Sequence, residues 1–221
     1  MSPLAILGGT FEPVHFGHLG LASDVRDALA LDGVRLVPSA DPPHRDSPRA
    51  SAADRVAMLR LAVADAPGLT VDTREITRGG KSYTVDTLAD LRAEMPARPL
   101  VLLVGADAFH GFPAWHRWRT LFDLAHIVVV PRPGVELERG LSAELLAAWH
   151  QRRVDDPQLL RERPAGTIYV QPVTAQPISS SFIRSRLAAG APSVEIAGLL
   201  PASVLAYIES HRLYRHVTHA D

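Results

Sequence analysis

Near its start the chain reads Leu4-Ala5-Ile6-Leu7-Gly8-Gly9-Thr10-Phe11-Glu12-Pro13-Val14-His15-Phe16-Gly17-His18. A short apolar run that ends in two glycines is typical of a buried strand passing into a turn. From His18 to Leu31 the apolar side chains recur at helical spacing, which predicts a helix after the turn. The segment therefore predicts the first strand, loop and helix of an α/β fold.

Strand and helix signals alternate through the rest of the chain. Short runs that are apolar, or that alternate in polarity, predict strands at Val34–Val37, Leu69–Ile76, Leu100–Val104, Ile127–Val130 and Ile168–Val170. Helical spacing predicts helices after the capping pair Ser51 and Asp54, and at Thr84–Met95, Ser142–Val154, Ser179–Ala189 and Pro201–His211. Strands separated by helices indicate a Rossmann-like, doubly wound parallel sheet.

The length of 221 residues fits one domain. We expect residues 1 to about 175 to form the sheet core, and residues from about 176 to 221 to form a small C-terminal helical subdomain. The stretch from Leu137 to Pro164 is polar and rich in arginine between its apolar positions. We expect it to be an insertion or a mobile region.

Composition excludes several classes of protein. The net charge is -1, so no overall positive field attracts nucleic acid, and any anion site must be local. The absence of cysteine excludes disulfides, thiolate metal sites and a cysteine nucleophile. The start of the chain has no basic, apolar leader, and no apolar run approaches the ~20 residues that span a bilayer. We expect a cytoplasmic protein with neither membrane nor nucleic acid as a partner.

The ends of the predicted strands indicate where a ligand binds. Open α/β sheets bind ligands beyond the carboxyl ends of their strands, where the strand order reverses. Four segments follow such ends and can converge on one crevice: Gly8-Gly9, Pro38–Arg45, Gly105–Asp107 and Pro131–Gly134. The segment from Ser39 to Ser51 is rich in proline and is a candidate lid.

Two histidines follow the first of these segments. His15 and His18 are spaced i, i+3, so they lie on one side of a helix start, and Gly17 leaves room between them. The free N–H groups of a helix start attract anions, so the combination predicts a phosphate cradle. Alternatively, the pair is made of ordinary histidines or is half of a metal site. Because further ligands at the required offsets are missing nearby, we predict no metal site.

A second motif lies near the other end of the chain, Ile178-Ser179-Ser180-Ser181-Phe182-Ile183-Arg184. Small hydroxyl side chains at a helix start can cap the helix and donate to phosphate oxygens. Arg184 follows one turn later and can reach the same anion. The alternative is a serine-capped helix with a solvated arginine.

Together the two motifs resemble those of the HxGH nucleotidyltransferase superfamily. Intermediate stretches are similar to those of bacterial nicotinate-nucleotide adenylyltransferases, namely Pro42-Pro43-His44-Arg45, Lys81-Ser82-Tyr83-Thr84-Val85-Asp86-Thr87-Leu88, Gly105-Ala106-Asp107, Phe112-Pro113-Ala114-Trp115 and Arg132-Pro133-Gly134. The resemblance covers nearly the whole chain and is least distinctive at residues 137–166. Glu12 stands where this family usually has aspartate, and Arg45 where lysine is common; both keep the charge.

The resemblance implies transfer of the adenylyl group of ATP to nicotinic acid mononucleotide, giving deamido-NAD and pyrophosphate. It implies three groups of residues. The catalytic group is His15, His18, Ser180 and Arg184; the ATP-binding group is Gly8, Gly9, Thr10, Phe11, Gly105, Asp107, Ile178 and Ser179; the mononucleotide-binding group is His44, Arg45, Ser82, Tyr83, Thr84, Trp115 and Arg132. Mg²⁺ would arrive with ATP, held by phosphates and water. The attacking phosphate is already anionic, so no general base is required.

Individual roles have a physical rationale and an alternative. Trp115 offers a flat face to a pyridine ring, or is a core tryptophan. Backbone N–H groups around Tyr83 and Thr84 could bind the nicotinate carboxylate. Asp107 could accept from ribose hydroxyls, or is a helix N-cap.

Other functions compatible with the motifs remain. One is an adenylyltransferase of the same superfamily that acts on nicotinamide mononucleotide or phosphopantetheine. Another is a non-catalytic nucleotide sensor, which loss of a motif histidine or of Arg184 would have favoured. An aminoacyl-tRNA synthetase needs a longer chain. The sequence does not distinguish a monomer from a homo-oligomer.

Overall fold

The computed structural model describes residues 1–42, 47–131, 136–174 and 176–215. Its centre is a sheet of six parallel strands in the order β3-β2-β1-β4-β5-β6. The strands are β1 (Leu4–Gly9), β2 (Gly33–Pro38), β3 (Leu69–Val71), β4 (Leu100–Gly105), β5 (His126–Val130) and β6 (Ile168–Val170). The order reverses between β1 and β4, which confirms the predicted doubly wound parallel sheet.

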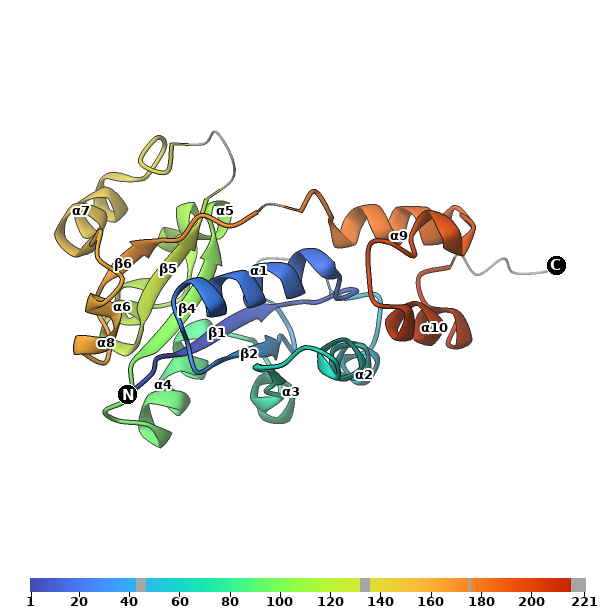
Figure 1. Cartoon of the computed structure of the whole chain (residues 1–221), viewed down its shortest axis with the longest axis horizontal. Coiled ribbons are helices and arrows are strands. Elements are labelled where there is room, and N and C mark those ends of the chain that lie inside the picture. Colours follow the sequence, from blue (N-terminus) through green and yellow to red (C-terminus); the bar gives the residue numbers. More distant parts are fainter. Residues whose placement is uncertain (43–46, 132–135, 175, 216–221) are drawn as a thin grey trace.

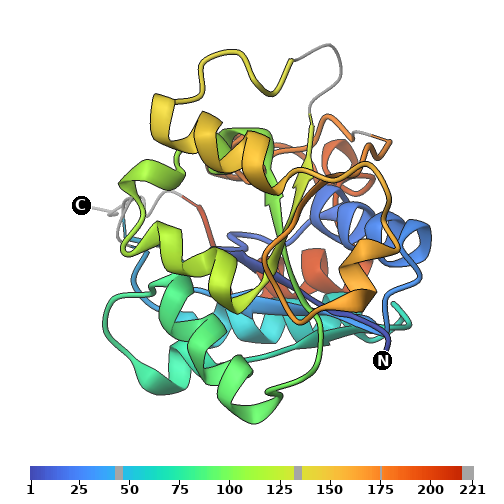
Figure 2. The same ribbon diagram turned by 90° about the vertical axis from the view of Figure 1, so that its left-hand side faces the viewer.

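Helices cover both faces of the sheet (Figures 1 and 2). They are α1 (Phe16–Ala28), α2 (Ala52–Val63), α3 (Arg74–Arg78), α4 (Thr84–Glu94), α5 (Ala106–His110), α6 (Leu121–Leu124), α7 (Ala143–Arg152), α8 (Leu159–Glu162), α9 (Ser180–Ala188) and α10 (Ala202–Ser210). Short 3₁₀ turns lie at Phe112–Ala114, Trp118–Thr120 and Ser193–Glu195. Within the described ranges no helix is both long and apolar enough to cross a membrane.

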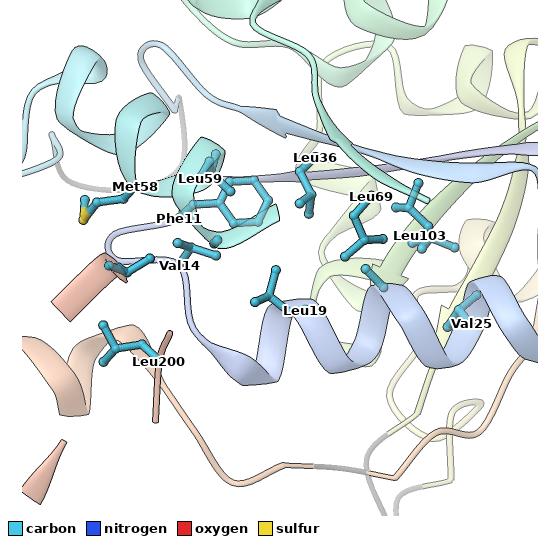
Figure 3. Packing of buried hydrophobic residues seen from close by; sticks show 14 of the residues in the cluster. Phe11, Val14, Leu19, Val25, Leu36, Met58, Leu59, Leu69, Leu103 and Leu200 are labelled. Carbon is cyan, nitrogen blue, oxygen red and sulfur yellow. The ribbon is translucent and has the colours of Figure 1, made fainter. Parts of the chain in front are cut away.

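Alternate residues of each strand pack on opposite faces, as the period of a strand requires. Val101 and Leu103 of β4 point into a cluster with α1, α2, α9 and α10, which Figure 3 shows around Phe11 and Leu36. Leu100 and Leu102 point into a second cluster, with α4, α5, α6 and α7. Because β1 and β4 are buried on both faces, the loops that follow them are held on a rigid base.

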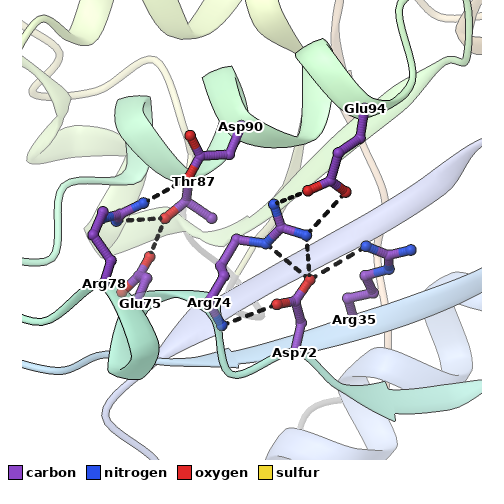
Figure 4. Close-up of polar contacts among 8 residues, drawn as sticks. All are labelled: Arg35, Asp72, Arg74, Glu75, Arg78, Thr87, Asp90 and Glu94. Carbon is purple, nitrogen blue, oxygen red and sulfur yellow. Dashed lines mark hydrogen bonds and ion pairs between the residues drawn. The ribbon is translucent and has the colours of Figure 1, made fainter.

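The prediction of a strand from Leu69 to Ile76 is wrong after Val71. The carboxylate of Asp72 accepts a hydrogen bond from the backbone N–H of Arg74 at 3.1 Å, and this turns the chain into α3. The same carboxylate pairs with the guanidinium groups of Arg35 and Arg74, and Arg74 also binds Glu94 of α4 (Figure 4). These long-range ion pairs override the local strand pattern.

The stretch from Leu137 to Pro164, expected to be an insertion or a mobile region, is packed into the fold in its described part. It forms α7 and α8, and the Ser142 hydroxyl caps α7 by accepting from the N–H of Leu145. Trp149 is buried on one face of the sheet and Leu160 on the other. The stretch therefore contributes to both cores.

The last helices pack onto the sheet domain rather than standing apart from it. Both α9 and α10 lie at one end of the molecule (Figure 1), where α10 packs against α2, and Ile183 and Leu205 belong to the same core cluster as α1. The division into a sheet core and a C-terminal helical subdomain stays a prediction.

Candidate active site

A cavity of about 630 Å³ lies at the carboxyl ends of the central strands, where the strand order reverses. Its wall includes Gly8 and Gly9 at the end of β1, Ser39 and Pro42 after β2, Gly105 at the end of β4, and Pro131 after β5. The predicted convergence of these strand ends on one crevice is confirmed for the described residues. The parts at 43–45 and 132–134 lie outside them.

Glycine is needed at both ends of the loop between β1 and α1, where β1 ends and where α1 begins. A Cβ on Gly9 would lie 3.2 Å from the buried Phe11 ring, and a Cβ on Gly17 would lie 3.0 Å from the His15 ring. Both distances are tighter than ordinary van der Waals contact. Glycine at these positions lets the two rings pack directly under the loop, and leaves the cavity side of the backbone open.

The two motif histidines stack on each other, with ring centroids 3.8 Å apart. Phe11 meets the His18 ring edge-on at 5.1 Å. Burial lowers the pKa of the His15 imidazole from 6.5 to about 4, so this ring is neutral at pH 7. Its Nδ1 atom is buried and has no hydrogen-bond partner among the described residues. His15 can therefore offer a neutral N–H to a ligand without the cost of burying a charge.

The second motif lies against the first, although 160 residues separate them in the sequence. The Ser180 hydroxyl donates to the carbonyl oxygen of Pro13 at 3.0 Å. The Arg184 guanidinium donates to the carbonyl oxygen of Glu12 at 2.6 Å. Ser179 caps α9 by accepting from the N–H of Phe182. The alternative of a solvated arginine is wrong, because Arg184 is half-buried and bound to the loop of the first motif.

Only some of the predicted ATP-binding residues line the cavity. Thr10 and Asp107 line the cavity together with the three strand-end glycines of this group. Asp107 lies in the first turn of α5, whose N-cap is Gly105, so the N-cap alternative for Asp107 is wrong. Phe11, Ile178 and Ser179 are not part of the cavity wall. The carbonyl oxygen of Ile178 lies near Gly17, which does line the cavity, since a Cβ built on Gly17 would be 3.5 Å from it.

The same cavity contains the described residues of the predicted mononucleotide-binding group, Ser82, Tyr83, Thr84 and Trp115. Ser82 is fixed by its hydroxyl, which accepts from the N–H of Ala40 at 2.8 Å. Tyr83 is the N-cap of α4 and makes no side-chain capping bond, so the helix start presents its own N–H groups. Trp115 is only half-buried and packs on Phe112 at 4.8 Å, which favours the ligand-facing role over that of a core tryptophan.

Some predicted site residues are not placed in the cavity. His15, His18, Ser180 and Arg184 are not part of its wall, which includes Gly17 beside them. His44, Arg45 and Arg132 lie outside the described residues. Across the described ranges, no group of three or more histidine, aspartate or glutamate side chains is placed to hold a metal ion.

Comparison with known proteins gives the family. A family model described as cytidylyltransferase-like matches residues 6–186. A probable nicotinate-nucleotide adenylyltransferase of Halorhodospira halophila is 50% identical over 202 residues, which is 91% of this chain and 90% of the relative. The protein of the same name from Stenotrophomonas maltophilia is 46% identical over 99% of both chains.

The chain belongs to the nicotinate-nucleotide adenylyltransferase family. It is thus a nucleotidyltransferase, and the resemblance seen in its motifs is confirmed. Among solved structures, Plasmodium falciparum nicotinic acid mononucleotide adenylyltransferase complexed with NaAD superposes with a TM-score of 0.72, covering 97% of this chain and 98% of that one. At 14% identity this similarity supports the fold alone.

Several cavity residues of this family member escaped the sequence analysis. Glu75 is buried, lines the cavity and accepts a hydrogen bond from the Thr87 hydroxyl at 2.6 Å (Figure 4). The incorrect strand prediction hid it. The His116 ring packs at a tilt against the Tyr83 ring, with ring centroids 4.5 Å apart, and its position beside Trp115 was the available signal. Val173, Thr174 and Gln176 follow β6, a strand whose end was left out of the predicted crevice.

Proposed function

We propose that this protein transfers the adenylyl group of ATP to nicotinic acid mononucleotide, giving nicotinic acid adenine dinucleotide and pyrophosphate. The observation that carries the proposal is the meeting of the two motifs at one loop, with Arg184 bound to Glu12 and Ser180 to Pro13. That loop borders a cavity which also contains Trp115 and the open start of α4. The cavity thus joins a phosphate-binding end to an end suited to an aromatic carboxylate.

The proposed reaction is an in-line displacement. An oxygen of the mononucleotide phosphate forms a bond to the α-phosphorus of ATP, the bond from that phosphorus to the bridging oxygen breaks, and pyrophosphate leaves with the electron pair. The attacking phosphate is already anionic, so no proton has to be removed. Catalysis then consists of aligning two anions and stabilising the charge that develops between them.

The proposed catalytic side chains fit that requirement. A neutral His15 and its stacked neighbour His18 offer N–H donors, while Arg184 supplies a fixed positive charge. Ser180 holds the loop and adds a hydroxyl. The metal is part of the substrate: Mg²⁺ accompanies ATP and keeps much of its phosphate and water coordination. For this reason the proposal needs no carboxylate cage in the protein.

We assign the pyridine end of the mononucleotide to Trp115 and the start of α4. Backbone N–H groups and the positive end of the helix dipole attract a carboxylate more strongly than a neutral amide. The partners are therefore ATP and nicotinic acid mononucleotide, with His44, Arg45 and Arg132 as further phosphate ligands.

We place the enzyme in the cytoplasm, since its lack of cysteine suits a reducing compartment. Its oligomeric state stays undecided.

Parallel steady-state assays with the acid and amide mononucleotides test the proposal. We expect kcat/KM for the acid to exceed that for the amide by about 100-fold. The interaction of a carboxylate with the helix start and with the N–H groups there contributes about 2 to 3 kcal/mol that the neutral amide lacks. Phosphopantetheine serves as a third acceptor. Equal or better use of the amide or of phosphopantetheine would replace the proposed substrate. If no acceptor released pyrophosphate from ATP, the nucleotide-sensor alternative would be favoured.

Replacing Trp115 by alanine should raise KM for the mononucleotide by about 10- to 100-fold, because stacking of one ring on an aromatic side chain is worth about 1–3 kcal/mol. KM for ATP should stay within about twofold. The Trp115→Phe variant, which keeps an aromatic face, is the matched control and should retain most of the affinity. Equal losses for both substrates would show that Trp115 is structural.

A further inference from the structure

A charged side chain occupies a core position of α2. Arg55 is 1% exposed and lies on the same face of the helix as Met58, Leu59 and Ala62, which belong to the hydrophobic core. Removing a guanidinium from water is costly unless it is paired and hydrogen-bonded. The partners of Arg55 therefore indicate why a charge stands at this position.

Those partners belong to the loop of the first motif. Nη1 of Arg55 donates to the carbonyl oxygen of Thr10 at 3.0 Å. Burial lowers the pKa of the Arg55 guanidinium, and the nearby Glu12 carboxylate partly offsets this effect. Glu12 is itself buried, and its carboxylate accepts from the N–H of Ala50, just before α2, at 2.7 Å. The loop and the start of α2 are thus joined by hydrogen bonds in both directions.

The residue between these two contacts has an uncommon backbone. Phe11 has a φ of 49°, in the left-handed region that residues with a Cβ seldom adopt. Such a conformation persists only where its surroundings enforce it. Here guanidinium groups hold the carbonyl oxygens on either side of Phe11: Arg55 holds that of Thr10, and Arg184 holds that of Glu12.

We propose that Arg55 is a positioning residue for adenylyl transfer, which fixes the Thr10–Glu12 turn so that the loop backbone faces the nucleotide phosphates. Thr10 lines the cavity and Arg55 does not, so Arg55 acts through the loop. The nearby Glu12 carboxylate offsets part of the cost of burying the guanidinium charge. The inference rests on the proposed function, because it assigns the loop to the reacting phosphates.

Replacing Arg55 by methionine tests it. We expect kcat to fall about 10- to 100-fold while KM for both substrates changes less than about threefold, because a small misplacement of catalytic groups costs rate more than affinity. Amide hydrogen exchange at residues 10–14 should become faster, with little change in β4 and β5. The matched control is Arg60→Met on the same helix, where the side chain is exposed; its kcat should be unchanged.

A double variant separates positioning from stability. Arg55→Met removes the cation near the buried Glu12 carboxylate and should lower thermal stability, whereas Arg55→Met with Glu12→Gln removes both charges and should recover it. Under the proposal the kcat of the double variant stays low, because nothing donates a hydrogen bond to the Thr10 carbonyl oxygen in place of Arg55. The separate variant Arg55→Lys, which keeps a donor, should regain part of the rate. Recovery of kcat together with stability in the double variant would overturn the proposal. An inactive wild-type enzyme would instead overturn the proposed function, and the exchange measurement tells the two failures apart.

Discussion

Alanine in place of His18 should lower kcat by about 100- to 1000-fold and change KM little. Removing one hydrogen-bond donor to a group that gains negative charge in the transition state typically lowers the rate by a factor of this size. The hydrogen bond strengthens as that charge develops, so its loss affects kcat more than KM. His18 is held for such a role, since its ring is stacked on His15 and braced edge-on by Phe11. Steady-state kinetics with both substrates varied give kcat and KM separately.

The control for this variant is His150→Ala. His150 is an exposed histidine on α7, and its removal should leave both constants unchanged. Thermal unfolding of the His18 variant checks that the stacked pair is not required for folding. An unchanged kcat would refute the catalytic role of His18, and a loss confined to KM would make it a binding residue only.

The Arg184→Met variant is expected to lose about 100-fold or more in kcat. The wild-type side chain carries the charge proposed to stabilise the leaving phosphates and also holds the Glu12 carbonyl oxygen at 2.6 Å. The variant loses the stabilising charge, and the loop also loses the hydrogen bond that holds its backbone at Glu12. Both losses lower the rate. In Arg184→Lys the charge remains but the planar fork is lost, so we expect only partial recovery.

Arg186→Met provides the comparison on the same helix. Arg186 forms an exposed ion pair with Glu195, and such pairs contribute at most about 1 kcal/mol to stability. Its kcat should stay within about twofold of wild type. If the Arg184 and Arg186 variants lost activity equally, the effect would come from α9 as a whole, and the assignment of Arg184 to the reacting phosphates would fail.

Most of the fold could be predicted, because its signals are local. The continuous apolar run at Leu100–Val104 gives a strand buried on both faces, and Gly105 marks its end. The error at Leu69–Ile76 has the opposite origin. There the carboxylate of Asp72 turns the chain by accepting from the backbone N–H of Arg74, and it is held by Arg35 of β2, while Arg74 is held by Glu94 of α4. The partners on β2 and α4 lie outside the local pattern.

The candidate site was predictable where a motif or a strand end marks it. Gly8 and Gly105 lie at strand ends and Asp107 follows one, and the parallel sheet places these strand ends at one edge. Glu75 carries no such mark, and His116 is marked only by its position beside Trp115. Arg55 did leave a signal, since it falls three and four residues before Met58 and Leu59 on the apolar face of α2. A charge at a core position of a helix indicates a buried partner, although the sequence does not say which one.

By itself, then, the sequence determined the parallel sheet, the edge at which ligands bind and the two motifs of a nucleotidyltransferase, because periodicity and glycine placement act over a few residues. The tertiary structure alone decided that Arg184 bonds to the loop at Glu12, that Arg55 bonds to Thr10, and that His15 is a neutral, buried ring. Each of these depends on side chains distant in sequence being packed together and removed from water. That burial sets both the strength of their hydrogen bonds and their state of protonation.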